Sequence, residues 1–188
     1  VLPLLAAVAV SLRVLLGCAH GDAAEPPTAR LCALAAFASL ALLLAIDALA
    51  LVGGAPGQRV LGTWFAGGDW RGEISFLLDA LSLPVATVAA LIGWLALRFS
   101  ANYLHREAGF HRFFIVMRLF LAGWQLVFLA GNGLLVFVGW ELCGITSFLL
   151  IGYAWQRPPA TGGALFAFVA NRAGDAGFLL GLGFSAAW

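Results

Sequence analysis

Long apolar stretches, separated by short polar ones, make up most of the chain. A helix needs about 20 apolar residues to cross a hydrocarbon core of about 30 Å. Six stretches reach or approach that length, and each predicts a transmembrane helix. They run approximately over Val1–Cys18, Leu31–Val52, Leu77–Phe99, Phe113–Leu129, Gly133–Trp155 and Ala164–Trp188. The pattern predicts an all-α membrane protein, with residues 1–188 forming a single polytopic membrane domain.

The connections between these stretches contain residues that break helices. Pro26 and Pro27 separate the first two spans, and Pro158 and Pro159 precede the sixth. The join before the fifth span is very short, so spans four and five should be antiparallel neighbours. Residues 53–75 form a longer loop outside the membrane, in which a glycine pair, Gly67-Gly68, stands between two aromatic runs. That loop predicts a short β-hairpin at the interface, with a loose loop as the alternative.

Composition excludes several classes of protein. The chain is 63% hydrophobic and 10% charged, with a mean hydropathy of +1.00. A soluble domain averages about 45–50% apolar and about 25% charged. These values, with a net charge of +1, exclude an ordinary soluble domain, a disordered tail and a nucleic-acid binder. Every basic residue is arginine, which removes any Schiff-base, lysine-nucleophile or Walker-type chemistry.

The sequence carries no readable motif for a metal or a cofactor. Cys18, Cys32 and Cys143 lie far apart, without a C-x-x-C pair or a Cys/His cluster. No G-x-G-x-x-G pattern is present for a dinucleotide. We therefore expect no catalytic redox site, no cofactor-binding site and no metal site in this chain.

The arginines predict an orientation. The loops after spans one, three and five carry five arginines, whereas the opposite loops carry two, Arg59 and Arg71. Cytoplasmic loops are richer in Lys and Arg, so the N-terminus should face outward. Arg13 and Arg118 are expected near cytoplasmic ends of their spans, where their side chains extend to the headgroups. The five arginines are Arg30, Arg98, Arg106, Arg112 and Arg157.

Glu141 is the acidic residue most deeply placed in an apolar span. It stands about eight residues into the fifth stretch, with apolar residues on both sides. A charge at a helix centre costs about 2.5–3.5 kcal/mol on the insertion scale, so the side chain should face protein or water, or be protonated. Glu141 is therefore a candidate proton carrier, against the alternative of a glutamate that only bonds a neighbouring helix.

The sixth span contains a second charged group. Arg172 and Asp175 are three residues apart and share one helical face, so we expect them to pair and to face another helix. The pair could act on the Glu141 charge or be purely structural. Asp79, His105 and His111 are accessory candidates, with interfacial or loop positions as their alternative reading.

The stretch Gly139–Gly152 resembles the fifth-helix motif of chain 5, or subunit L, of proton-pumping NADH:quinone oxidoreductase, respiratory complex I. Other segments are similar in the same order. They are Leu2–Leu4, Phe76–Ser82, Ser100 with Tyr103, Arg112–Phe114 and Arg172–Asp175. The resemblance covers essentially the whole chain, and the fifth-helix motif is its most specific part.

The resemblance implies the N-terminal part of a larger antiporter-like bundle that moves protons through buried charged residues. It places the family's membrane glutamate at Glu141 and places Arg172 and Asp175 near the proton path. Partner subunits would hold NADH, FMN, iron–sulfur clusters and quinone and carry out electron transfer. The chain would be an enzyme only as a subunit of that translocase, in a bacterial inner membrane beside other membrane subunits.

Some residues depart from the family pattern and keep alternatives open. The family's glutamate works with lysines on later helices, which this chain lacks, and Gly131 replaces a usual acidic residue. Arg118 is also unusual at its place. A multisubunit sodium/proton antiporter, an inorganic-carbon uptake complex and a passive membrane scaffold remain alternatives. The valine at position 1 and the apolar end at Trp188 are what a fragment would show.

Overall fold

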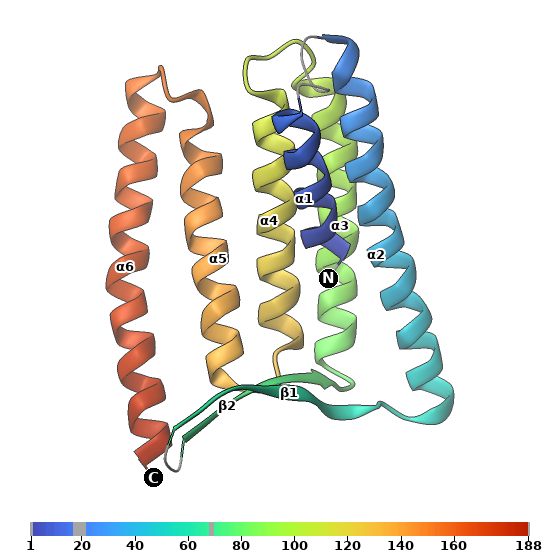
Figure 1. The fold of residues 1–188 in the computed structure, drawn as a ribbon, viewed down its shortest axis with the longest axis vertical. Coiled ribbons are helices and arrows are strands. Elements are labelled where there is room, and N and C mark those ends of the chain that lie inside the picture. Colours follow the sequence, from blue (N-terminus) through green and yellow to red (C-terminus); the bar gives the residue numbers. More distant parts are fainter. Residues whose placement is uncertain (1, 17–21, 68–69, 188) are drawn as a thin grey trace.

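Helices that lie side by side, with a β-hairpin crossing one end, form the molecule (Figure 1). A computed structural model describes residues 2–16, 22–67 and 70–187. Within those residues, five candidate spans are long and apolar enough to cross a membrane. They correspond to α2 (Glu25–Gly53), α3 (Ser82–Tyr103), α4 (Phe110–Leu129), α5 (Gly133–Ile151) and α6 (Pro158–Ala187). The predicted all-α membrane architecture is confirmed.

The first predicted span is only partly described. Helix α1 (Leu2–Leu15) has 14 residues, which at 1.5 Å per residue is about 21 Å and less than a bilayer core. Val1, Gly17 and Cys18 of that prediction, like His20, lie outside the described residues. Arg13 lies in the last turn of α1, as expected from the sequence.

Three helices begin earlier than their apolar stretches. A short 3₁₀ turn, η1 (Asp22–Ala24), leads directly into α2, and Pro26 and Pro27 lie inside the first turn of that helix. Helix α6 likewise starts at Pro158 rather than at Ala164. The prediction that these prolines lie in the connections between spans was wrong. They fit inside the first turn of each helix, because an N–H there would have no partner within the helix and its absence costs little. Helix α4 starts at Phe110, three residues before the predicted Phe113.

The predicted hairpin is confirmed. Strand β1 (Gly57–Gly67) pairs antiparallel with β2 (Trp70–Leu78), from Gly57 opposite Leu78 to Gly67 opposite Trp70. Residues 68 and 69, including Gly68 of the predicted glycine pair, lie outside the description. The predicted start of the third span at Leu77 was wrong, because the last residues of β2 pair with β1 and α3 begins only at Ser82.

The hairpin is attached to the α4–α5 join. The Gly131 amide donates to the carbonyl oxygen of Ser75 at 2.8 Å. The Asn132 side chain accepts from the Leu135 amide at the start of α5, and its Nδ2 donates to the carbonyl oxygen of Glu73. A Cβ at position 131 would stand 2.9 Å from the carbonyl carbon of Ser75, so a larger residue there would force the hairpin to shift.

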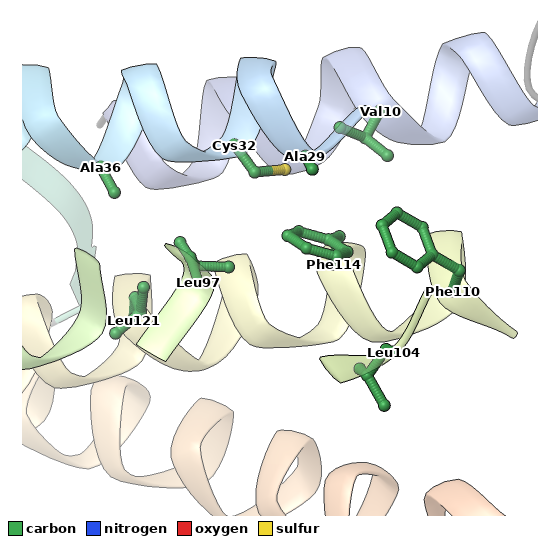
Figure 2. Close-up of a cluster of buried hydrophobic side chains, with 9 residues drawn as sticks. All are labelled: Val10, Ala29, Cys32, Ala36, Leu97, Leu104, Phe110, Phe114 and Leu121. Carbon is green, nitrogen blue, oxygen red and sulfur yellow. The ribbon is translucent and has the colours of Figure 1, made fainter. Parts of the chain in front are cut away.

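The core lies between α1, α2, α3 and α4. Figure 2 shows Phe110 and Phe114 of α4 facing Cys32 of α2 and Val10 of α1. Large apolar side chains also cover the outside of the helices, as in Leu51 at 89% exposed and Phe166 at 78%. That surface suits hydrocarbon rather than water. Helix α6 lies at the edge of the bundle beside α5 (Figure 1). The 3₁₀ turn η2 (Gly152–Ala154) lies in the connection between these two helices.

Candidate functional site

Glu141 projects from α5 toward α6. Its Oε2 lies 2.7 Å from Nη1 of Arg172, and the glutamate side chain is 23% exposed. Helix α5 is apolar throughout apart from a few small or polar positions, so the only strong electrostatic contact of Glu141 described is this arginine. The glutamate is thus held in an ion pair between two helices, as a charge at membrane depth requires.

Arg172 also contacts the second carboxylate. Its Nε lies 3.0 Å from Oδ2 of Asp175, one turn along α6, and the Asp175 side chain is only 7% exposed. This contact is a close ion pair without the alignment of a hydrogen bond. The guanidinium stacks over the Phe168 ring, 5.2 Å from its centroid. The predicted intrahelical pair facing another helix is confirmed, and Arg172 bridges Glu141 and Asp175.

Trp140 completes the group and was not predicted from the sequence. Its Nε1 donates to Oδ1 of Asp175 at 2.9 Å, across the α5–α6 interface. The Trp140 ring also stacks on Phe178, with centroids 6.1 Å apart. A signal was available, since an indole N–H in an apolar helix needs a buried acceptor. We name Trp140, Glu141, Arg172 and Asp175 the carboxylate–arginine cluster.

Glycines set how closely the helices around the cluster approach. At Gly144, a Cβ would lie 3.4 Å from Nη2 of Arg172, so the glycine leaves room for the arginine head. On the other side of α5, a Cβ at Gly139 would stand 2.9 Å from the Gly123 carbonyl oxygen of α4. Small residues allow such approaches between helices in lipid. Helix α5 is therefore in close backbone contact with α4 while α6 carries the arginine.

The accessory candidates lie apart from the cluster. Oδ1 of Asp79 accepts from the backbone amides of Leu81 at 3.0 Å and Ser82 at 2.6 Å, just before α3. Both hydrogen bonds lower the pKa of the Asp79 carboxyl, and the one from the Ser82 amide contributes more than the one from the Leu81 amide. Asp79 holds the start of α3.

The two histidines belong to the end of the molecule opposite the hairpin. Nδ1 of His105, in the turn after α3, lies 2.7 Å from Oε2 of Glu25 at the start of α2. The His111 ring packs edge-on against Phe110 in the first turn of α4. The structure places neither histidine with Glu141, so any part they take in proton movement would be at the membrane surface.

Arg118 differs from the sequence prediction. It is 1% exposed and lies eight residues, about 12 Å, into α4, counted from Phe110. The expectation that its side chain extends to the headgroups was wrong, because the helix begins earlier than predicted and its arginine faces α2 and α3. Within the described residues, no group of three or more His, Cys, Asp or Glu gathers to hold a metal ion.

Comparison with known proteins places this geometry in a family. Residues 64–114 match the model described as NADH-Ubiquinone oxidoreductase (complex I), chain 5 N-terminus. Residues 130–184, which contain the whole carboxylate–arginine cluster, match the model described as NADH:quinone oxidoreductase/Mrp antiporter, TM. Over these two segments the chain is similar to the antiporter-like membrane subunits. Its expected resemblance to chain 5, or subunit L, is confirmed.

Curated relatives agree with these matches. The NAD(P)H-quinone oxidoreductase subunit 5 of the Paulinella chromatophora chromatophore is 35% identical over 131 residues, 70% of this chain and 20% of that protein. The NADH-quinone oxidoreductase subunit L of Escherichia coli K12 is 37% identical over 118 residues, 63% of this chain and 19% of that protein. The chain thus spans about a fifth of the length of the relatives it matches.

Proposed function

We propose that this chain forms part of a proton-translocating membrane subunit of an NADH:quinone oxidoreductase. The observation that carries the proposal is the cluster itself: Arg172 bridges Glu141 on α5 and Asp175 on α6 at membrane depth. The names of the relatives indicate the assembly, a quinone oxidoreductase. The cluster supports a role for this chain in moving protons within that assembly. Residues 1–188 act as one membrane domain, with 53–75 outside the membrane.

Charge arithmetic supports a proton-carrying role for the cluster. Two carboxylates and one guanidinium carry a net charge of −1 when both acids are ionised and are neutral when one proton is bound. Because charge is costly in hydrocarbon, a change in the environment of Arg172 shifts the balance between these two states. Glu141 and Asp175 are the proton-carrying groups in this scheme, and Arg172 sets which of them is neutralised.

A cavity supports a route to the cluster from the hairpin end. It measures about 450 Å³ and is lined by hairpin residues and by the facing ends of α5 and α6, from Asn132 and Leu134 to Leu179 and Leu182. The cluster lies one to two turns deeper along both helices. Phe137 and Phe178, with centroids 5.7 Å apart, lie between cavity and cluster in helix order. In the proposed route these rings separate cavity water from the cluster.

Partner subunits carry the remaining chemistry in this proposal. NADH, FMN, iron–sulfur clusters and quinone would bind to them, while other membrane subunits extend the bundle past α6. The connection between α3 and α4 and that between α5 and α6 lie at one end of the structure (Figure 1) and contain Arg106 and Arg157. Arg30, Arg98 and Arg112 lie near the same end, inside α2, α3 and α4 rather than in the loops where the sequence placed them. We propose that this end is cytoplasmic, the N-terminus is outside, and the membrane is a bacterial inner membrane.

The test replaces Glu141 in the full-length subunit within its assembled complex. Glu141→Gln keeps the shape and removes the titratable group, so proton uptake by vesicles should fall at least tenfold while the complex still assembles. Glu141→Asp should retain partial activity. Glu107→Gln, an exposed loop carboxylate, is the matched control and should pump normally. Wild-type pumping by an assembled Glu141→Gln complex would favour a passive scaffold.

A second function follows from the family model that includes Mrp antiporters. The same cluster could exchange sodium for protons without redox partners. Vesicle uptake driven by NADH and independent of sodium supports the first function. Uptake driven only by a sodium gradient would replace it by the antiporter.

A further inference from the structure

The two carboxylates of the carboxylate–arginine cluster have different surroundings. Both oxygens of Asp175 lie against N–H groups. Its Oδ1 accepts from Nε1 of Trp140 at 2.9 Å, and its Oδ2 lies 3.0 Å from Nε of Arg172. Glu141 contacts Arg172 through Oε2, and within the described part of the chain its Oε1 takes part in no hydrogen bond or ion pair. The Asp175 side chain is 7% exposed, against 23% for Glu141.

A proton on either oxygen of Asp175 would meet a donor that is already in place. The indole N–H of Trp140 can only donate, and so can each N–H of the guanidinium. A proton on Oδ1 would weaken the hydrogen bond from the indole. A proton on Oδ2, which is buried beside Nε of Arg172, would set two donors against each other. The contacts of Asp175 therefore suit its ionised form.

Glu141 accepts a proton at a smaller cost. Its Oε1 can be protonated while Oε2 stays against Arg172. Arg172 and Asp175 then form a neutral pair beside a neutral carboxylic acid, and every contact that the structure shows is kept. Because net charge is costly at membrane depth, this is a favourable arrangement for a cluster that holds one proton.

We propose that Trp140 is a positioning residue that keeps Asp175 ionised and directs the proton to Oε1 of Glu141. This inference rests on the proposed function and narrows it. Of the two proton-carrying carboxylates, Glu141 gains and loses the proton, and Asp175 remains the counter-charge of Arg172. The proton comes from a hydronium ion, which leaves as water, and the reverse step releases it. Trp140 acts through Asp175 only.

The position of Trp140 permits a variant that removes little besides the N–H. Its ring is 39% exposed and stacks on Phe178, with centroids 6.1 Å apart. A phenyl ring keeps an aromatic surface against Phe178 and lacks the donor, so Trp140→Phe should still assemble. Loss of a hydrogen bond to a charged group should shift the partition of the proton between the two carboxylates by about tenfold.

The experiment records infrared difference spectra between acid and alkaline pH for the full-length subunit in its complex. Protonated carboxyls absorb apart from carboxylates, and aspartate labelled with heavy carbon at its side-chain carboxyl separates aspartic from glutamic acids. The wild type should show a protonated-carboxyl band that Glu141→Gln removes and the label does not shift. In Trp140→Phe, part of that band should be replaced by one that the label shifts, and proton uptake by vesicles should fall about tenfold.

The matched control is Trp124→Phe. It makes the same change in α4, where the Trp124 ring stacks on Phe128 with centroids 5.3 Å apart, and it should leave spectra and uptake unchanged. The same band replacement in Trp124→Phe would overturn the role of the Trp140 N–H. So would a Trp140→Phe complex without a label-sensitive band.

The labelled wild type tests the proposal even if Trp140→Phe fails to assemble, because a cluster band that shifts with labelled aspartate would place the proton on Asp175 and overturn it. Failure of the proposed function gives another result. Normal pumping by Glu141→Gln would refute proton translocation by the cluster. Normal pumping and an unchanged spectrum in Trp140→Phe, with pumping lost in Glu141→Gln, would refute the role of Trp140 alone.

Discussion

Two arginines in membrane-crossing helices have opposite surroundings. Arg172 of α6 lies within 3.0 Å of two carboxylates and keeps a side chain that is 36% exposed. Arg118 of α4 is 1% exposed, and its Nε and Nη2 have no partner in the described residues. The first charge is compensated within the chain, whereas the second lies beside a cavity between α2, α3 and α4. The role of an arginine in an apolar helix therefore depends on whether carboxylates lie within ion-pair distance of its guanidinium.

The largest expected effect is that of Arg172→Gln. Without the cation, Glu141 and Asp175 become neighbouring carboxylates with no counter-charge. Breaking a buried ion pair costs about 3–5 kcal/mol, and solvent screening of the partly exposed Arg172 reduces the expected loss to about 2–3 kcal/mol. The melting temperature of the purified complex and its proton uptake should both fall. Arg172→Gln combined with Asp175→Asn should recover much of the stability, and a single variant that melts and pumps normally would remove the cluster from the mechanism.

Arg118→Leu should act in the opposite direction. Removing an uncompensated charge from mid-membrane removes a cost of about 2.5–3.5 kcal/mol on the insertion scale. In detergent, the variant should therefore melt at a higher temperature than the wild type. A loss of stability like that of Arg172→Gln would mean that the two arginines have equivalent surroundings after all.

The smallest expected effect is that of Asp79→Asn. Asp79 lies outside the spans, so its effect on the melting temperature is the reference for the variants of the two arginines. Its pKa is lower in the folded chain than its ordinary value of 3.8, because the Ser82 and Leu81 amides donate to the carboxylate. A lowered folded pKa gives stability that is present above 3.8 and lost as the pH falls through the folded pKa. Acid should therefore lower the melting temperature of the wild type more than that of Asp79→Asn. Asp79→Asn should change the acid dependence of the melting temperature by the same amount in the wild type, in Arg172→Gln and in Arg118→Leu. An effect of Asp79→Asn that differed between these backgrounds would show that Asp79 is energetically coupled to the arginine concerned.

The sequence predicted what depends on local spacing. Arg172 and Asp175 are one turn apart, so their pairing follows from helix geometry alone. The spans and the hairpin followed from apolar length and a glycine pair. Helix starts at Glu25 and Pro158 were missed because proline breaks a helix in its interior but fits its first turn.

Contacts between helices could not be predicted in the same way. The Glu141–Arg172 distance depends on how the turn before Pro158 sets the register of α6 against α5, and no local pattern gives that register. The burial of Arg118 depends on which face of α4 packs against α2 and α3. Trp140 could have been suspected from its N–H, yet its acceptor on α6 required the packed structure.

The contact of α4 with α5 has a mechanical consequence. Around Gly123 and Gly139 the two backbones lie in close contact. A Cβ at Gly123 would stand 3.1 Å from the Gly139 carbonyl oxygen, and a Cβ at Gly139 would stand 2.9 Å from the Gly123 carbonyl oxygen. Two helices in such close backbone contact resist sliding along each other. The hydrogen bonds of Asn132 attach the join between α4 and α5 to the hairpin. We therefore expect α4, α5 and the hairpin to move as one rigid body. A conformational change that breaks and re-forms the contact between Arg172 and Glu141 would then be a displacement of α6 relative to this rigid body.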